Sequence, residues 1–159
     1  MAGLLAVIAV VFLHLKLAAR PGPELTLIGT SVLIGLVFDS MIVGSGWIRY
    51  PSGMFVPGIA PYWILGMWAL FATTLNASMN WMKGRLLLAS LMGAVFGPLS
   101  YMGGARLGGL EFVNFEAAMM ALAAAWAVAM PLLVISAGRF NGLSSPESRP
   151  EFQLADGNS

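Results

Sequence analysis

Asp39 is the residue whose position most needs a chemical explanation. It interrupts the apolar run GLVFDS at residues 35–40. A carboxylate inside a membrane helix costs several kcal/mol unless it is protonated, paired or facing water. Asp39 is therefore a candidate functional residue, and a contact that holds two helices together explains it equally well.

Arg106 is the natural partner for that carboxylate. Its guanidinium can present a bidentate fork to a carboxylate or to a phosphate. The glycine-rich stretch before it also contains Ser100 and Tyr101, two further candidates for ligand binding. We predict an Asp39–Arg106 pair, with an anchor beside lipid phosphates as the alternative for Arg106. The stretch lacks the Gly-Lys-Ser/Thr ending of a nucleotide-binding phosphate loop.

A second group of polar candidates comprises His14, Asn76 and Asn80. The two asparagines are four residues apart and share one face of a helix. His14 is expected at a similar depth in the membrane. Such a cluster can relay a proton or hold a polar ligand, or it can join helices through hydrogen bonds of typically about 0.6 kcal/mol each.

The residue types present exclude several kinds of site. The chain has no Cys and a single His, so disulfides, thiolate metal sites and multi-histidine metal sites within one chain are excluded. We expect no catalytic residue, no metal and no cofactor. With a formal net charge of +1, nucleic acid is not an expected partner.

The elements that position these residues are membrane helices. The 159 residues are 58% hydrophobic and 9% charged, with mean hydropathy +0.84, whereas soluble domains carry about 25% charged residues. We predict an all-α, polytopic transmembrane bundle forming a single membrane domain over residues 1–138, followed by a disordered cytoplasmic tail at 139–159. Spanning helices need roughly 20 apolar residues. They are expected at residues 2–19, 25–45, 62–82, 86–104 and 116–137.

The connections between the spans carry helix breakers and polar residues. The run RPGP at residues 20–23 separates the first two spans, since proline lacks the N–H and fixes φ. The run KGR at 83–85 predicts a hairpin, and residues 44–61 predict an interfacial loop at headgroup depth. The positive charges follow the first apolar run, which favours a retained helix over a cleaved signal peptide.

The distribution of Lys and Arg predicts the orientation. Six lie on one predicted side and two on the other, which places the C-terminus in the cytoplasm and the N-terminus outside a bacterial inner membrane. The six are Lys16, Arg20, Lys83, Arg85, Arg139 and Arg149, and the two are Arg49 and Arg106.

Small residues suggest close helix packing. Gly93 and Gly97 form a G-x-x-x-G pair, and alanines recur every four residues over 117–129. Such patterns serve folding within the chain or self-association. The expected partners are membrane lipids, with other membrane proteins or a second copy as alternatives.

Four motifs together carry a family resemblance. They are DS at 39–40, PxW at 61–63, LxxWxxFATTLNxS at 65–78 and GxxxGPxxYxxGxxLG at 93–108. On these motifs, which span most of residues 13–133, the chain resembles a bacterial inner-membrane family known as domain of unknown function 2878. The resemblance implies no established activity and no catalytic residue. It implies a further helix before residue 1, and a link to envelope-lipid metabolism because members are often encoded near fatty-acid-modifying enzymes.

Three functions are compatible with these observations. The leading one is a non-enzymatic accessory or lipid-associated protein of envelope-lipid metabolism. The second is a small carrier or channel component with Asp39 as a protonatable group. The third is a membrane-embedded enzyme acting on lipid, for which the sequence offers few acid–base pairs.

Overall fold

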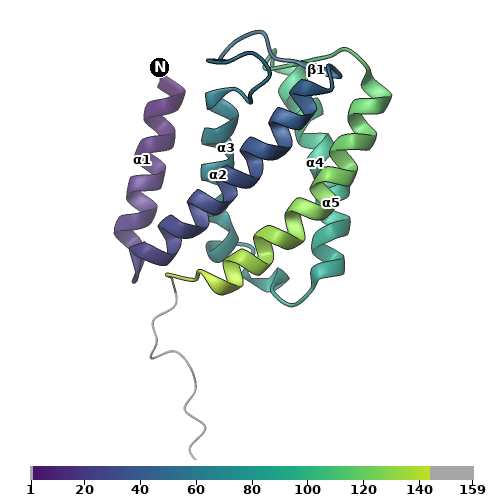
Figure 1. Cartoon of the computed structure of the whole chain (residues 1–159). Coiled ribbons are helices and arrows are strands. Elements are labelled where there is room, and N and C mark those ends of the chain that lie inside the picture. The colour runs from purple at the N-terminus through teal and green to yellow at the C-terminus, as the bar shows by residue number, and fades with distance from the viewer. Residues whose placement is uncertain (1, 144–159) are drawn as a thin grey trace, which may run out of the picture.

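The computed structural model describes residues 2–143, which form a bundle of five helices (Figure 1). Successive helices run in opposite directions, so the connections gather at two ends of the bundle. The helices are α1 (Ala2–Leu17), α2 (Pro21–Gly44), α3 (Tyr62–Ala77), α4 (Leu86–Arg106) and α5 (Phe115–Arg139).

Three short elements complete the described part of the chain. The 3₁₀ helix η1 (Asn80–Met82) lies in the α3–α4 connection. Strand β1 (Ile48–Arg49) pairs antiparallel with β2 (Glu111–Phe112). This ribbon ties the α2–α3 connection to the α4–α5 connection at the same end of the bundle.

Helix α2 begins earlier than the sequence pattern suggested. Arg20 is its extended N-cap residue, and Pro21 and Pro23 lie in its first turn. Proline is tolerated there because the first N–H groups of a helix have no partner within it. The helix therefore begins four residues before the expected span at 25–45, and Glu24 belongs to it.

The other helix boundaries also moved. Helix α3 ends at Ala77, so the predicted span 62–82 contains a helix of 16 residues, a turn and η1. Helix α4 continues past residue 104 and ends at Arg106, with Pro98 inside it. Helix α5 begins at Phe115, where the Asn114 side chain caps it by accepting from the Ala117 N–H at 3.1 Å.

The expectation of an all-α membrane bundle is confirmed at the level of helix length and composition. Within residues 2–143, helices α2, α4 and α5 are long and apolar enough to cross a membrane. A shorter apolar helix covers Gly3–Leu17. Helix α3 has 16 residues, about 24 Å at 1.5 Å per residue.

Glycines let the helices approach one another closely. A Cβ on Gly97 would overlap the Trp126 ring, and one on Gly93 would overlap the Trp126 carbonyl oxygen. The predicted G-x-x-x-G pair therefore packs α4 against α5 within the chain. Gly35 does the same between α2 and α3, where a Cβ would overlap the Trp68 ring.

The chain beyond α5 was expected to be disordered from residue 139. Arg139 is the last residue of α5, and residues 140–143 lie against the first turn of α2. Residues 144–159 of the predicted tail lie outside the described residues.

Candidate functional site

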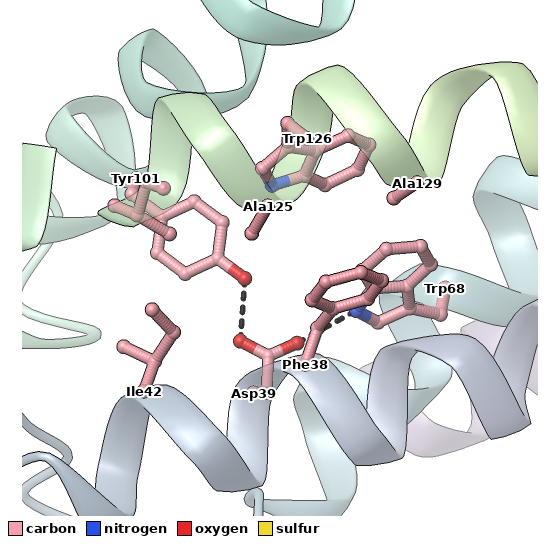
Figure 2. A pocket seen from close by; sticks show the side chains of 9 residues that line it. Phe38, Asp39, Ile42, Trp68, Tyr101, Ala125, Trp126 and Ala129 are labelled. Atoms are coloured by element: carbon pink, nitrogen blue, oxygen red, sulfur yellow. Dashed lines mark hydrogen bonds between the residues drawn. The ribbon is translucent and has the colours of Figure 1, made fainter. Parts of the chain in front are cut away.

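Asp39 lies in the core of the bundle and accepts hydrogen bonds from three aromatic side chains. It is 1% exposed. The Tyr101 hydroxyl of α4 donates to Oδ1, and the Trp68 Nε1–H of α3 donates to Oδ2 at 2.7 Å (Figure 2). The Tyr50 hydroxyl, from the loop after β1, also donates to Oδ1 at 3.3 Å. One carboxylate thus joins three segments of the chain to α2.

The Trp68 ring is fixed on both sides. Gly35 leaves room for it against α2, and the Trp126 ring of α5 stacks on it with centroids 4.8 Å apart and planes 8° from parallel. Offset stacking of this kind contributes about 0.5–1.5 kcal/mol beyond the buried area. The indole N–H is therefore held in place for its bond to Asp39.

A small cavity lies beside the carboxylate. Its volume of about 10 Å³ has room for roughly one water molecule. The lining residues are Phe38, Asp39, Ile42, Trp68, Tyr101, Leu122, Ala125, Trp126 and Ala129, most of them labelled in Figure 2. The polar groups in the wall belong to Asp39, Trp68, Tyr101 and Trp126, and the other lining side chains are apolar.

Tyr50 keeps its proton in this arrangement. Burial raises the pKa of its hydroxyl above the ordinary value, and the neighbouring Asp39 carboxylate raises that pKa further. The phenol is therefore a hydrogen-bond donor at neutral pH.

The predicted Asp39–Arg106 pair is wrong. Arg106 is the last residue of α4 and is exposed, and within residues 2–143 it forms no ion pair with Asp39. The aromatic donors occupy both oxygens of the carboxylate instead. Of the neighbouring candidates, Tyr101 reaches Asp39, whereas Ser100 is exposed and donates to the Gly97 carbonyl at 2.6 Å.

A second buried carboxylate, Glu24, lies in the first turn of α2 near the opposite end of the bundle. It is 0% exposed. His14 Nε2 of α1 lies 2.8 Å from Oε2, and the Asn76 Nδ2–H of α3 donates to Oε1 at 2.7 Å. The backbone N–H of Gly142 also donates to Oε1, at 2.8 Å.

Lys83 extends this second group toward the α3–α4 connection. Its Nζ donates to Asn76 Oδ1 at 2.8 Å, so the amide bridges the ammonium and Glu24. Burial lowers the pKa of the Lys83 ammonium, and the negative charge of Glu24 opposes that shift.

Two members of the predicted His–Asn group therefore lie together, and the residue that joins them was not predicted. His14 and Asn76 meet through Glu24. Asn80 belongs to η1 and is exposed, and among residues 2–143 its side chain forms no hydrogen bond with this group. Glu24 was not predicted as a site residue because the prolines at residues 20–23 indicated a break between helices.

A signal for Glu24 was present in the sequence. Proline is common in the first turn of a helix, so the run RPGP can begin α2. Once α2 includes residue 24, Glu24, Ser31 and Asp39 fall on one face with Gly35 between them, and all are buried. Trp68 and Tyr50 were not among the predicted site residues.

The His, Asp and Glu side chains of the described residues do not meet the requirements of a metal site. Within residues 2–143, no three His, Asp or Glu side chains gather closely enough to hold one. The groups around each carboxylate are hydrogen-bond donors. Such donors stabilise the negative charge of the carboxylate and do not act as ligands for a cation.

The helices and their composition define a multi-pass helical membrane protein. The chain belongs to the family described as Protein of unknown function (DUF2878), whose model matches residues 1–132. Comparison with curated proteins and with solved structures gives no match.

Proposed function

We propose that this protein is a non-enzymatic accessory protein of a bacterial inner membrane that associates with lipid and serves envelope-lipid metabolism. The observation that carries the proposal is an apolar cap at the end of the bundle where β1 and β2 lie. We define the cap as the exposed Met, Phe, Val, Ile and Leu side chains of the two connections at that end. They are Met54, Phe55, Val56, Ile59, Leu107 and Val113.

The cap differs from an ordinary solvent-facing loop. Phe55 is 84% exposed and Leu107 is 90% exposed, and residues 50–61 carry no charge. Exposed apolar patches of this kind mark binding surfaces. Trp47 and Tyr62 lie in the same region and are partly exposed, and both residue types favour the interface between water and lipid. A lipid leaflet is the occupant that fits this composition.

The interior supports an accessory role over an internal ligand site. Within the described residues, every buried side-chain nitrogen or oxygen has a hydrogen-bond partner. The cavity beside Asp39 has room for roughly one water molecule. Both observations favour function at the surface of the bundle.

A small carrier is the second candidate. Glu24, Ser31 and Asp39 lie on one buried face of a single helix. Buried carboxylates in membrane helices are common in proton relays. About 22 Å of helix separates the two carboxylates at 1.5 Å per residue, and Ser31 between them donates to the Trp68 carbonyl. A carrier would have to open this packed region.

The proposed orientation places the cap outside and the C-terminus in the cytoplasm. All five helices then cross, with α1 and α3 as short spans. The Lys and Arg residues at the end opposite the cap support this orientation. An alkaline phosphatase fused to the C-terminus should be inactive in this arrangement, and an active fusion would reverse it.

A depth measurement tests the cap. The chain has no Cys, so Phe55→Cys and Glu111→Cys each provide one site for a spin label. In lipid nanodiscs the label at 55 should be relaxed more strongly by oxygen than by a water-soluble nickel complex. The label at 111, an exposed glutamate at the same end, should show the reverse. Equal exposure of both labels to the nickel complex would contradict the proposed contact between the cap and lipid.

A lipid profile tests the physiological role. A strain lacking the gene is compared with strains restored by the wild type, by Phe55→Ser and by Asp39→Asn. We expect a specific change in acyl chains or headgroups that the wild type corrects and Phe55→Ser does not. Proton or solute flux in proteoliposomes that Asp39→Asn abolishes, with an unchanged lipid profile, would favour the carrier.

A further inference from the structure

Residues 140–143 continue beyond α5 and form a strap across the first turn of α2. The Arg20 N–H donates to the Gly142 carbonyl at 2.9 Å, and the Arg20 side chain donates to the Asn141 carbonyl at 2.8 Å. The Asn76 side chain donates to the Phe140 carbonyl at 2.9 Å. Three successive carbonyls of the strap are thus bound by two residues of other elements.

Glu24 supplies the matching acceptor. Its Oε1 accepts from the Gly142 N–H at 2.8 Å, alongside the Asn76 amide. The strap backbone is therefore recognised through both its N–H and its carbonyl groups. Main-chain hydrogen bonds also supply much of the affinity when proteins bind peptides, because they do not depend on the side chains of the peptide.

Gly142 is the point of closest approach. A Cβ at this position would overlap the Arg20 carbonyl oxygen and would lie 2.8 Å from Glu24 Cγ. Only glycine lets the backbone come this near to the carboxylate. By contrast, a Cβ on Gly138, four residues earlier in α5, would meet nothing within 4 Å.

We propose that Arg20, Glu24 and Asn76 form a binding site for a short peptide segment, and that residues 140–143 of the same chain are its occupant. The strap covers Glu24 and accounts for part of its complete burial. When the strap leaves, Glu24 Oε1 loses one donor and the Arg20 N–H loses its acceptor. This proposal is independent of the lipid-associated function, because it concerns the opposite end of the bundle.

Thiol labelling tests the strap directly. The chain has no Cys, and Leu143, which is partly buried, is replaced by Cys as a reporter. In lipid nanodiscs, where both faces are accessible, the rate of maleimide labelling is measured for Leu143→Cys alone and combined with Gly142→Ala. Gly138→Ala in the same background is the matched control.

We expect Gly142→Ala to raise the labelling rate at least fivefold and Gly138→Ala to leave it unchanged. Near-UV circular dichroism should be the same for all three proteins, because the substitution acts on Gly142, whereas Phe140 at the start of the strap stays packed against the core. Equal labelling rates for the Gly142→Ala and Gly138→Ala proteins would overturn the proposal. Loss of the near-UV signal in the Gly142→Ala protein would also overturn it, since residues 141–143 could then not leave without disrupting the packed helices.

Discussion

The two carboxylates of α2 are both buried yet are held in different ways. Asp39 accepts from one indole and two phenols, all uncharged side chains fixed by packing. Glu24 accepts from an imidazole, an amide and a backbone N–H. The Lys83 ammonium donates to that same amide side chain and does not contact Glu24 directly. One centre lies in the core among aromatic rings, and the other lies near an end of the bundle where chain segments meet.

This difference separates fixed from releasable contacts. The donors to Asp39 come from α3, α4 and the loop after β1, so they move only if the bundle opens. One donor to Glu24 comes from the strap, which is joined to a single helix. Side-chain bonds in the core hold the fold, whereas the bond to the strap can break while the helices stay packed.

The largest expected effect is the loss of the Asp39 carboxylate. Asp39→Ala leaves three buried donors without an acceptor, and an unpaired buried group costs about 1–3 kcal/mol. We expect the free energy of unfolding to fall by about 3 kcal/mol. Asp39→Asn keeps one oxygen and should lose about half as much. Titration with a denaturing detergent, followed by tryptophan fluorescence, measures both.

Glu111→Ala is the control for this series. Glu111 is exposed and lies 4.0 Å from Arg49, and surface pairs of this kind contribute little. The unfolding midpoint should not move detectably. If Asp39→Ala were as stable as Glu111→Ala, the three hydrogen bonds would have no structural role.

The Glu24 centre should show pairwise coupling with His14. Glu24→Gln and His14→Gln are each expected to lower the free energy of unfolding by about 2 kcal/mol, because each leaves the other group without its partner. The double variant should lose about 1 kcal/mol less than the sum of the two. Additive losses would mean that the 2.8 Å contact contributes no coupling energy.

Crowding at the Asp39 centre gives the next effect in size. Gly35→Ala places a methyl group against the Trp68 ring, and overpacking of a core costs typically about 1–3 kcal/mol. We expect a loss of about 1.5 kcal/mol. Gly29→Ala on the same helix is the matched control, because a Cβ there meets nothing within 4 Å. Equal stability of the two variants would show that Trp68 can move away from α2 without loss.

How far the sequence predicts this site depends on what kind of signal each residue gives. A single acidic residue in an apolar run stands out, so Asp39 was identified without a structure. Tyr101 was found because it sits in a distinctive glycine-rich stretch. Trp68 and Tyr50 were not, since aromatic residues are common in membrane helices and interfaces and their spacing does not show where their polar atoms point.

Glu24 and the strap were not predicted, for a different reason. A run of two prolines reads either as a break or as the first turn of a helix, and the two readings place Glu24 outside or inside the bundle. The bond from Gly142 to Glu24 joins residues 118 positions apart. No local pattern encodes such a contact, although the membrane helices themselves follow directly from composition.

The smallest expected effect concerns Arg106, and it tests the corrected pairing. Arg106 is exposed at the end of α4, so Arg106→Gln should leave the unfolding midpoint unchanged. In a cycle with Asp39→Asn the two substitutions should be additive, because the aromatic donors already occupy both oxygens of Asp39. A coupling energy of about 1 kcal/mol or more would restore an Asp39–Arg106 interaction and displace the aromatic site. Suppose that Arg106 and Asp39 are additive and that Glu24 and His14 are coupled. Glu24 would then depend on a side chain that can carry a positive charge, whereas Asp39 would depend on uncharged aromatic donors alone.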